Sequence, residues 1–170
     1  MMIREKDLEL KNLQRLISDV LALAETFKAT VSINSGMATA NLGDATGIHL
    51  PQNKYDLAAV RSKLEKYQLL GISAHNLIEG RAAKGADYIT ISPVFETASK
   101  PGYGPALGEK GLAQIVRSLN IPVIGLGGVE PSNISKIRNV GAAGAAVMGG
   151  VMRAKNPKQK VCDLIAAWHG

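Results

Sequence analysis

Two pairs of neighbouring glycines stand at the ends of apolar runs in the second half of the sequence. Gly127 and Gly128 close the run IPVIGLGGV, and the pattern predicts a helix from Pro131. Gly149 and Gly150 close the run AAVMGGVM, ahead of a short helical piece expected from Val151. Glycine accepts positive φ and lets a ligand reach backbone amides. Either pair alone would be an ordinary tight turn, but both pairs on the last two strands predict a phosphate site built from amides.

A second candidate region is the connection at residues 92–108, SPVFETASKPGYGPALG, which is too long for an ordinary βα turn of about 2 to 6 residues. Its side chains Thr97, Ser99 and Lys100 are hydrogen-bond donors suited to an anionic group. The alternative is a solvated surface loop. Loops of this length are usually functional, so we expect it to contribute to the site.

The amino-terminal residues carry a third group of charges. Arg4 and Lys6 would project to the same side of a strand while Glu5 turns away, although a charged terminus is the simpler interpretation. Polar residues also stand at other strand ends, namely Asn34, Ser73 and His75. A lone histidine such as His49 or His75 is more often structural than catalytic. We predict no metal site, because no pair of carboxylates stands at matching strand ends.

The elements that position these residues follow a βα rhythm. Apolar runs of strand length alternate with helical patterns, and Gly, Pro, Asn or Ser marks each junction. The predicted strands are residues 2–4, 30–34, 47–50, 69–73, 88–94, 122–127 and 145–149. The predicted helices are residues 8–27, 57–67, 76–83, 110–119, 131–140 and 157–168, with a shorter one within 35–42. Strands that are apolar throughout, such as YITISPV, indicate a parallel sheet covered on both faces.

Two α/β architectures fit this rhythm, a doubly wound open sheet and a closed (β/α)8 barrel of TIM type. A complete barrel has eight strands and typically about 200 residues or more. Seven recognisable parallel strands in 170 residues therefore indicate a barrel whose first strand and helix are missing. No linker or low-complexity stretch marks a boundary, so residues 1–170 are expected to form a single domain.

The composition narrows the functional classes. A single cysteine, Cys162, and a polar amino terminus favour a cytoplasmic protein, and no run approaches the roughly 18 apolar residues of a membrane span. The net charge is +6, but the basic residues are scattered and only 4% of residues are aromatic. Nucleic-acid and membrane partners are therefore not expected. A basic excess instead suits a small anionic metabolite.

Six segments, read together, resemble the thiamine phosphate synthase and TenI superfamily. They are IREKD at 3–7, GIHLPQ at 47–52, GISAH at 71–75, GADYITISPVFETASKPG at 85–102, IPVIGLGGV at 121–129 and AAVMGGVM at 145–152. The resemblance implies a (β/α)8 barrel. It also implies one of two activities on phosphorylated thiamine precursors. The synthase branch joins hydroxymethylpyrimidine diphosphate to thiazole phosphate and releases diphosphate, whereas the TenI branch aromatises a thiazole phosphate carboxylate.

The resemblance also implies roles for individual residues. The diphosphate-binding, catalytic cations of the synthase branch correspond to Arg4, Lys6 and Lys100. Residues expected to bind substrate are Asn34, Ser73, Thr97, Ser99, Gly127, Gly128, Met148, Gly149 and Gly150. Cations around the departing diphosphate would stabilise the negative charge that develops there.

The sequence departs from both branches at specific positions. Ser35 and Lys54 occupy the places of the two carboxylates that hold Mg²⁺ in the synthase branch, so no cofactor is assigned here. Gly149 replaces a serine, and Met2 replaces a glutamine. Segments such as HLPQ and VFET look closer to TenI proteins, but Pro93 stands where that branch has its acid/base histidine.

Three hypotheses follow from this pattern. The first is a synthase-like transferase of thiamine biosynthesis, the second is a TenI-type thiazole tautomerase, and the third is a catalytically silent phosphate-binding or regulatory protein. Under each hypothesis, the protein binds a small phosphorylated metabolite. Without a first βα unit, the outer strands would have unpaired edges, so we also expect a homo-oligomer.

Overall fold

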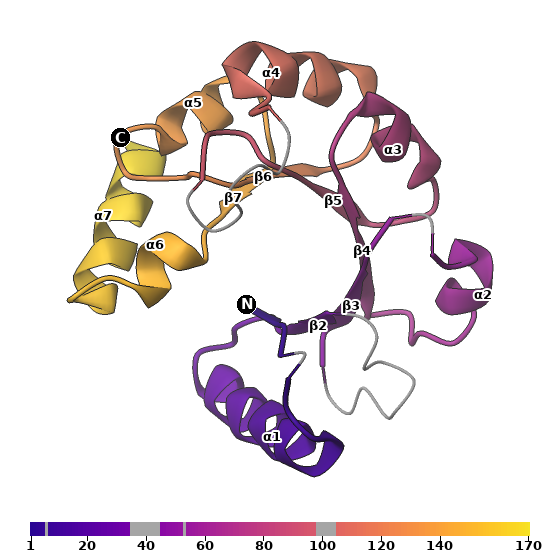
Figure 1. The fold of residues 1–170 in the computed structure, drawn as a ribbon. Helices are drawn as coiled ribbons and strands as arrows, with labels where there is room; N and C mark the ends of the chain where they lie inside the picture. The colour runs from indigo at the N-terminus through magenta and orange to yellow at the C-terminus, as the bar shows by residue number, and fades with distance from the viewer. Residues whose placement is uncertain (6, 35–44, 53, 98–104) are drawn as a thin grey trace. The chain divides into compact units, whose positions relative to one another are not determined.

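The structure is a computed structural model that describes residues 1–5, 7–34, 45–52, 54–97 and 105–170. Strands and helices alternate along the chain (Figure 1). They group into two compact units. The first comprises Met1–Ile72 with Gly85–Asp87, and the second comprises Ser73–Lys84 with Tyr88–Gly170.

The strands of the first unit are parallel and neighbour one another in chain order. They are β1 (Met2–Ile3), β2 (Ser32–Asn34), β3 (Gly47–Leu50) and the first four residues of β4 (Leu69–Ala74). Their register aligns a row of buried apolar side chains, in which Ile3 is opposite Ile33, Ile33 opposite Ile48, and Ile48 opposite Leu70. This row explains the register, because a shift by one residue would turn each of these side chains to the other face.

Two helices accompany these strands. In α1 (Leu10–Thr26), Leu16, Ile17, Val20 and Leu21 pack against a cluster of Ile3, Ala24 and Val31. Helix α2 (Leu57–Arg61) begins at Asp56, whose carboxylate accepts from the amides of Ala58 and Ala59. Asp56 thereby satisfies amides that have no partner inside the helix.

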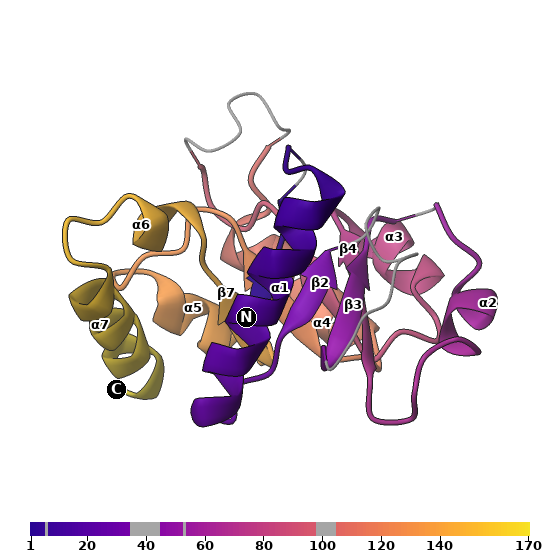
Figure 2. The ribbon, with the colours of Figure 1, turned by 90° about the horizontal axis from the view of Figure 1, so that it is seen from below.

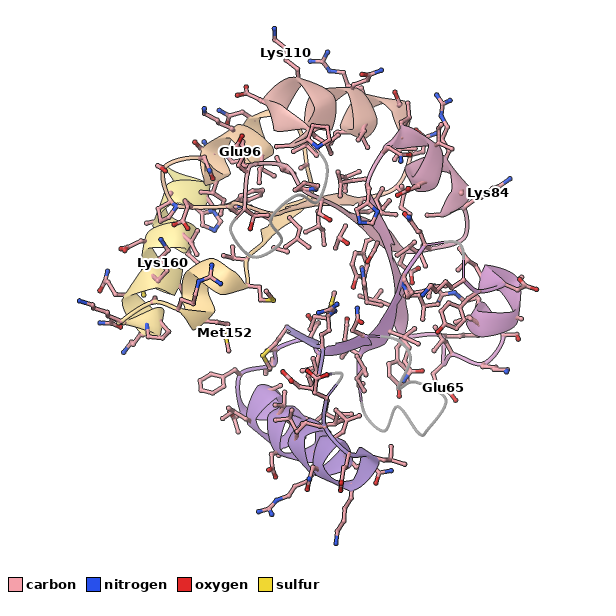
Figure 3. All side chains as sticks on the ribbon, viewed as in Figure 1. Glu65, Lys84, Glu96, Lys110, Met152 and Lys160 are labelled. Carbon is pink, nitrogen blue, oxygen red and sulfur yellow. The ribbon has the colours of Figure 1, made fainter. Side chains whose placement is uncertain are left out.

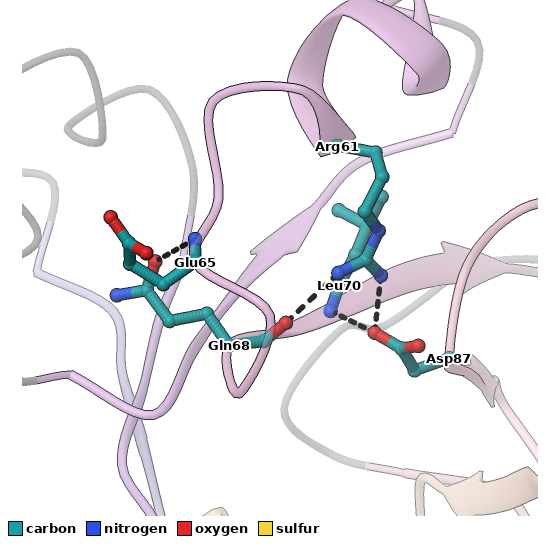
Figure 4. A network of polar contacts seen from close by, with 5 residues as sticks. All are labelled: Arg61, Glu65, Gln68, Leu70 and Asp87. Atoms are coloured by element: carbon teal, nitrogen blue, oxygen red, sulfur yellow. Dashed lines mark hydrogen bonds and ion pairs between the residues drawn. The ribbon is translucent and has the colours of Figure 1, made fainter.

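A polar network in the first unit connects the end of α2 to the start of β4 (Figure 4). The guanidinium of Arg61 donates to the carbonyl of Gln68 at 2.9 Å and pairs with the carboxylate of Asp87. The same carboxylate accepts from the amide of Leu70 at 2.6 Å. The helix predicted at 57–67 therefore ends early, because Arg61 is used to anchor the start of β4.

The described part of the second unit contains three further parallel strands and five helices. Its strands are β5 (Tyr88–Ile91), β6 (Val123–Leu126) and β7 (Gly144–Ala146), and β6 pairs with both of the others. Its helices are α3 (Leu77–Ala82), α4 (Gly108–Ser118), α5 (Ile134–Asn139), α6 (Gly149–Met152) and α7 (Pro157–His169). Figures 1 and 2 both show α7 beside α5 and α6. Buried side chains of this unit include Ile89, Ile91, Leu112 and Ile137.

The predicted α/β class and its seven parallel strands are confirmed, while several boundaries are wrong. The last strand ends at Ala146 and not at 149, because Gly149 already begins α6. The strand predicted to reach 94 ends at Ile91. The helix predicted from Pro131 begins at Ile134, after a turn.

Two other sequence predictions are not tested by these elements. The short helix expected within 35–42 lies outside the described residues. The single domain expected over residues 1–170 stays a prediction. In the described part of the chain, no helix combines the length and apolar character required to cross a bilayer.

Candidate phosphate site

The end of β6 turns through two glycines in the left-handed region of the backbone map. Gly127 has φ of 101° and Gly128 has φ of 63°. A Cβ on Gly128 would stand 2.2 Å from the carbonyl oxygen of Glu96, and one on Gly127 would stand 3.0 Å from Cα of Pro93. Both conformation and space therefore require glycine here.

These glycines let the segment after β5 lie directly on the end of β6. The amide of Val94 donates to the carbonyl of Leu126 at 2.9 Å, and the amide of Phe95 donates to the carbonyl of Gly127 at 3.0 Å. The side on which a Gly128 side chain would lie is thus filled by protein. The glycine pair has a packing function besides any role toward a ligand.

The end of β7 leads almost directly into α6. Met148 precedes the helix with a side chain that is 55% exposed, and its carbonyl accepts from the amides of Val151 and Met152. The first amides of a helix have no partner within it. Across the described residues, no acceptor is seen for the N–H groups of Gly149 and Gly150. Gly149 is buried and Gly150 is partly exposed, so the amide of Gly150 is the more accessible of these two donors.

The two glycine turns are neighbours. A Cβ on Gly150 would stand 3.7 Å from the carbonyl oxygen of Val129 and 3.1 Å from Oε1 of Glu130, the residues that directly follow Gly128. Gly150 carries no left-handed φ. A Cβ at Gly150 would therefore require the Glu130 side chain to shift, whereas one at Gly128 would meet backbone.

Asn133 braces the turn between Gly128 and α5. Its side chain accepts from the amide of Glu130 at 2.8 Å and donates to the carbonyl of Gly128 at 2.9 Å. Glu130 in turn forms an ion pair with Lys160 of α7. Sequence reasoning missed these three residues. The only available signal was the asparagine ahead of a helix, which is typical of a helix start.

Other predicted residues of the second unit have defined surroundings. Nδ1 of His75 lies 3.0 Å from Oε2 of Glu79, which also accepts from the His75 amide, and Asn76 and Glu79 cap the start of α3 reciprocally. These contacts favour a structural role for His75 over a catalytic one. Ser73 in β4 and the half-buried Thr97 also have polar partners. Ser99 and Lys100 lie outside the described residues.

The predicted residues of the first unit that the structure describes are spread over four places. Arg4 is exposed after β1, and Lys54 is exposed before α2. Asn34 ends β2, where its amide nitrogen lies 3.8 Å from the sulfur of Met2. His49 is buried in β3, and burial lowers its pKa to about 4, so the ring is neutral at pH 7. Lys6 and Ser35 lie outside the described residues.

The residues at the family's metal positions do not fit Mg²⁺. A magnesium ion is held by oxygen ligands and commonly by carboxylates. This chain offers the hydroxyl of Ser35 and the ammonium of Lys54 in their place. In the described ranges, no three His, Cys, Asp or Glu side chains form a group suited to a metal ion.

The described part of the second unit also has an open hollow of about 600 Å³ between α4 and α5. Glu109, Gln114 and Arg117 are among its lining residues, and none of the four glycines is. The hollow is a separate surface feature.

Comparisons with known proteins agree with the geometry. The sequence model of the family described as "Thiamine monophosphate synthase" matches residues 1–151. A putative thiamine-phosphate synthase of Geobacter sulfurreducens is 34% identical over 166 residues, which are 96% of this chain and 78% of that protein. The thiamine-phosphate synthase of Archaeoglobus fulgidus is 31% identical over 163 residues, which are 95% of this chain and 77% of that protein.

A solved structure extends the similarity to the fold. The thiamine phosphate pyrophosphorylase of Pyrococcus furiosus superposes with a TM-score of 0.86 at 25% identity, covering 99% of this chain and 81% of that one. The TIM-barrel-type class inferred from the sequence is thus confirmed. Since the family model and the relatives span nearly the whole chain, this chain belongs to the thiamine monophosphate synthase and TenI family.

Proposed function

We propose that this chain is a thiamine-phosphate synthase that binds thiazole phosphate through the backbone amides of Gly127, Gly128, Gly149 and Gly150, with Met148 beside them. One observation carries the proposal: two glycine turns follow paired strands of one unit, and a Cβ on Gly150 of the second turn would lie within 4 Å of Val129 and Glu130 after the first. The names and the 30–37% identity of the relatives support the same activity.

The other substrate would be hydroxymethylpyrimidine diphosphate. In the reaction, the carbon–oxygen bond to diphosphate breaks and its electrons leave with the diphosphate, while the thiazole nitrogen forms the new bond to the pyrimidine methylene. Arg4, Lys6 and Lys100 would stabilise the departing charge, and Asn34, Ser73, Thr97 and Ser99 would orient the substrates. Lys54 would supply additional positive charge where the family has a carboxylate. No step is assigned to Mg²⁺, because the residues at its positions do not fit it.

A TenI-type tautomerase is the weaker enzymatic alternative. Pro93 stands at the position of that branch's acid/base histidine, and its Cα lies 3.0 Å from the Cβ position of Gly127. Proline has no side-chain group that can transfer a proton. A catalytically silent phosphate-binding protein would keep the glycine turns alone.

Calorimetry and a turnover assay distinguish the three functions. We expect binding of thiazole phosphate, binding of the pyrimidine diphosphate, and formation of thiamine phosphate when both are present. Aromatisation of the thiazole phosphate carboxylate without coupling would instead identify the tautomerase. Binding of thiazole phosphate without either turnover would identify the silent protein, and no binding would contradict the proposal.

We also propose that copies of the chain associate. In the first unit, Met1 and Leu10 are 65% and 57% exposed, and in the second unit Met152 and Ile165 are 78% and 55% exposed. Each unit thus exposes large apolar side chains, and contiguous apolar surface is typical of protein interfaces. Sedimentation should show dimers or larger species, and a sharp monomer at all concentrations would contradict association.

A further inference from the structure

Glu130 places a carboxylate beside the second glycine turn. Its Oε1 lies 3.1 Å from the point at which a Cβ on Gly150 would stand. The backbone of Glu130 is fixed, because its amide donates to Asn133 and its carbonyl accepts from the amide of Ile134 at 2.9 Å. The carboxylate lies beside Gly150, one of the residues whose amides are proposed to bind phosphate.

A carboxylate in this place should oppose an anionic ligand. A phosphate monoester carries about 1.5 to 2 negative charges at pH 7. Like charges a few ångströms apart repel more strongly near a protein surface than in bulk water. An unbalanced Glu130 would therefore raise the Kd for any phosphate at the amides of Gly149 and Gly150.

Lys160 supplies the balancing charge from α7. Its ammonium is hydrogen-bonded to Oε2 of Glu130, the oxygen other than the one beside Gly150. Lys160 lies in the first turn of α7 (Figure 3). Its amide donates to the carbonyl of Asn156 at 3.1 Å. The side chain of Lys160 is 24% exposed and that of Glu130 is 44% exposed, so solvent screens the pair in part.

We propose that Lys160 is a positioning residue for the phosphate site. Lys160 neutralises Glu130 and fixes the direction of its carboxylate. The amides of Gly149 and Gly150 can then donate hydrogen bonds to an anionic ligand. The proposal rests on the proposed function, because without a phosphate ligand Glu130 has nothing to repel. The proposal predicts that removing the Lys160 side chain weakens phosphate binding only while Glu130 is charged.

A double-mutant cycle with thiazole phosphate as the probe tests this dependence. In calorimetry, Lys160→Met should raise the Kd about tenfold, whereas Glu130→Gln should leave it unchanged or lower it. The combination of Glu130→Gln with Lys160→Met should return the Kd to within about threefold of the unaltered chain. Lys158→Met removes an exposed lysine from the same helix and should change the Kd by less than about twofold.

The dephosphorylated thiazole alcohol provides a second readout. Because it carries no phosphate, its affinity should be the same in the unaltered chain and the Lys160→Met variant. Equal losses for alcohol and phosphate would show a general structural role and overturn the proposal. A double variant that stays as weak as Lys160→Met would also overturn it, because Lys160 would then act without Glu130.

The same experiment separates this proposal from the proposed function. If the unaltered chain binds thiazole phosphate and Lys160→Met binds equally well, the role of Lys160 is wrong while the phosphate site stands. If the unaltered chain does not bind thiazole phosphate at all, the proposed function is wrong and the role of Lys160 falls with it.

Discussion

The phosphate half of the proposed site, at the turns after β6 and β7, is made of backbone, whereas the diphosphate half is assigned to the side chains of Arg4, Lys6 and Lys100. In the backbone half, φ angles and close packing leave few alternatives to glycine at Gly127 and Gly128. In the side-chain half, the family's carboxylates are replaced by Ser35 and Lys54. A backbone site is thus tied to the stability of the fold, while a side-chain site can change its chemistry by substitution.

The strongest test of that difference compares two glycines with nearly the same φ. Gly128→Ala should lower the free energy of unfolding by about 3 kcal/mol or more, because Cβ would meet the carbonyl of Glu96 in addition to the left-handed strain. Gly108 has φ of 64° and nothing within 4 Å of its Cβ position, so Gly108→Ala should cost about 1 kcal/mol from strain alone. Denaturant unfolding measures both.

Equal losses from these two variants would contradict the packing account of Gly128. From the sequence alone, a side chain at Gly128 would be expected to block the phosphate and leave the fold intact. The structure contradicts the part about the fold, because the space beside Gly128 is occupied by the segment after β5, while the effect on phosphate binding stays a prediction.

A buried histidine gives the first unit a pH dependence. The folded pKa of His49 is about 4 and the ordinary value is 6.5, so the unfolded chain binds more protons between these values. The contribution of His49 to the free energy of unfolding should therefore be constant above pH 6.5. It should fall as the pH decreases from 6.5 to 4. The loss should approach about 3 kcal/mol, as expected for this difference in pKa.

Unfolding measured across this pH range checks the assignment. His49→Gln should flatten the dependence, even though it also changes a buried side chain. His169→Gln is the matched control, because His169 is exposed at the end of α7 and its removal should leave the slope unchanged. A slope that survives His49→Gln would assign the effect to other groups.

The second glycine turn allows ligand binding to be changed without unfolding. Gly150→Val adds a side chain that meets the carboxylate of Glu130, which must shift to make room, and it strains no left-handed φ. The Kd for thiazole phosphate should rise by roughly two orders of magnitude, about 2.7 kcal/mol, while the free energy of unfolding changes by about 1 kcal/mol or less. Calorimetry and denaturant unfolding on the same variant separate the two quantities.

Gly144→Val is the control for this experiment. Gly144 begins β7 at the opposite end of the strand from Gly150, and its Cβ position has only a distant contact with Ile124 at 3.9 Å. The affinity of the Gly144→Val variant for thiazole phosphate should match that of the unaltered chain. Unchanged affinity in Gly150→Val would remove the phosphate from this turn and leave Lys100 as its most plausible partner.

The sequence predicted the strands and helices well where apolar patterns are regular, and less well where single polar contacts decide a boundary. The row of Ile3, Ile33, Ile48 and Leu70 is readable as apolar runs. The early end of α2 is not, because it depends on Arg61 reaching Asp87, 26 residues later. Such a contact is visible only after the chain has folded.

The candidate site shows the same division. Glycine pairs after apolar strands could be recognised from residue types alone. The ion pair between Glu130 and Lys160 could not, because the two residues are 30 positions apart and both types are common on surfaces. Resemblance to a family also could not assign them, since it transfers only those positions that the family's motifs contain.

The smallest expected effect concerns the side-chain half of the site. With Ser35 and Lys54 in place of carboxylates, synthase turnover should depend little on Mg²⁺, because a hydroxyl and an ammonium are poor ligands for this ion. Ser35→Asp combined with Lys54→Asp should restore a Mg²⁺ response and raise turnover about tenfold, equivalent to about 1.4 kcal/mol. Ser35→Asn combined with Lys54→Gln removes the ammonium without adding carboxylates and should show no Mg²⁺ response.

If both double variants respond alike, the positive charge of Lys54 and not the missing carboxylates limits the reaction. If neither differs from the unaltered chain, the diphosphate half does not depend on these positions, and its cations alone stabilise the departing group.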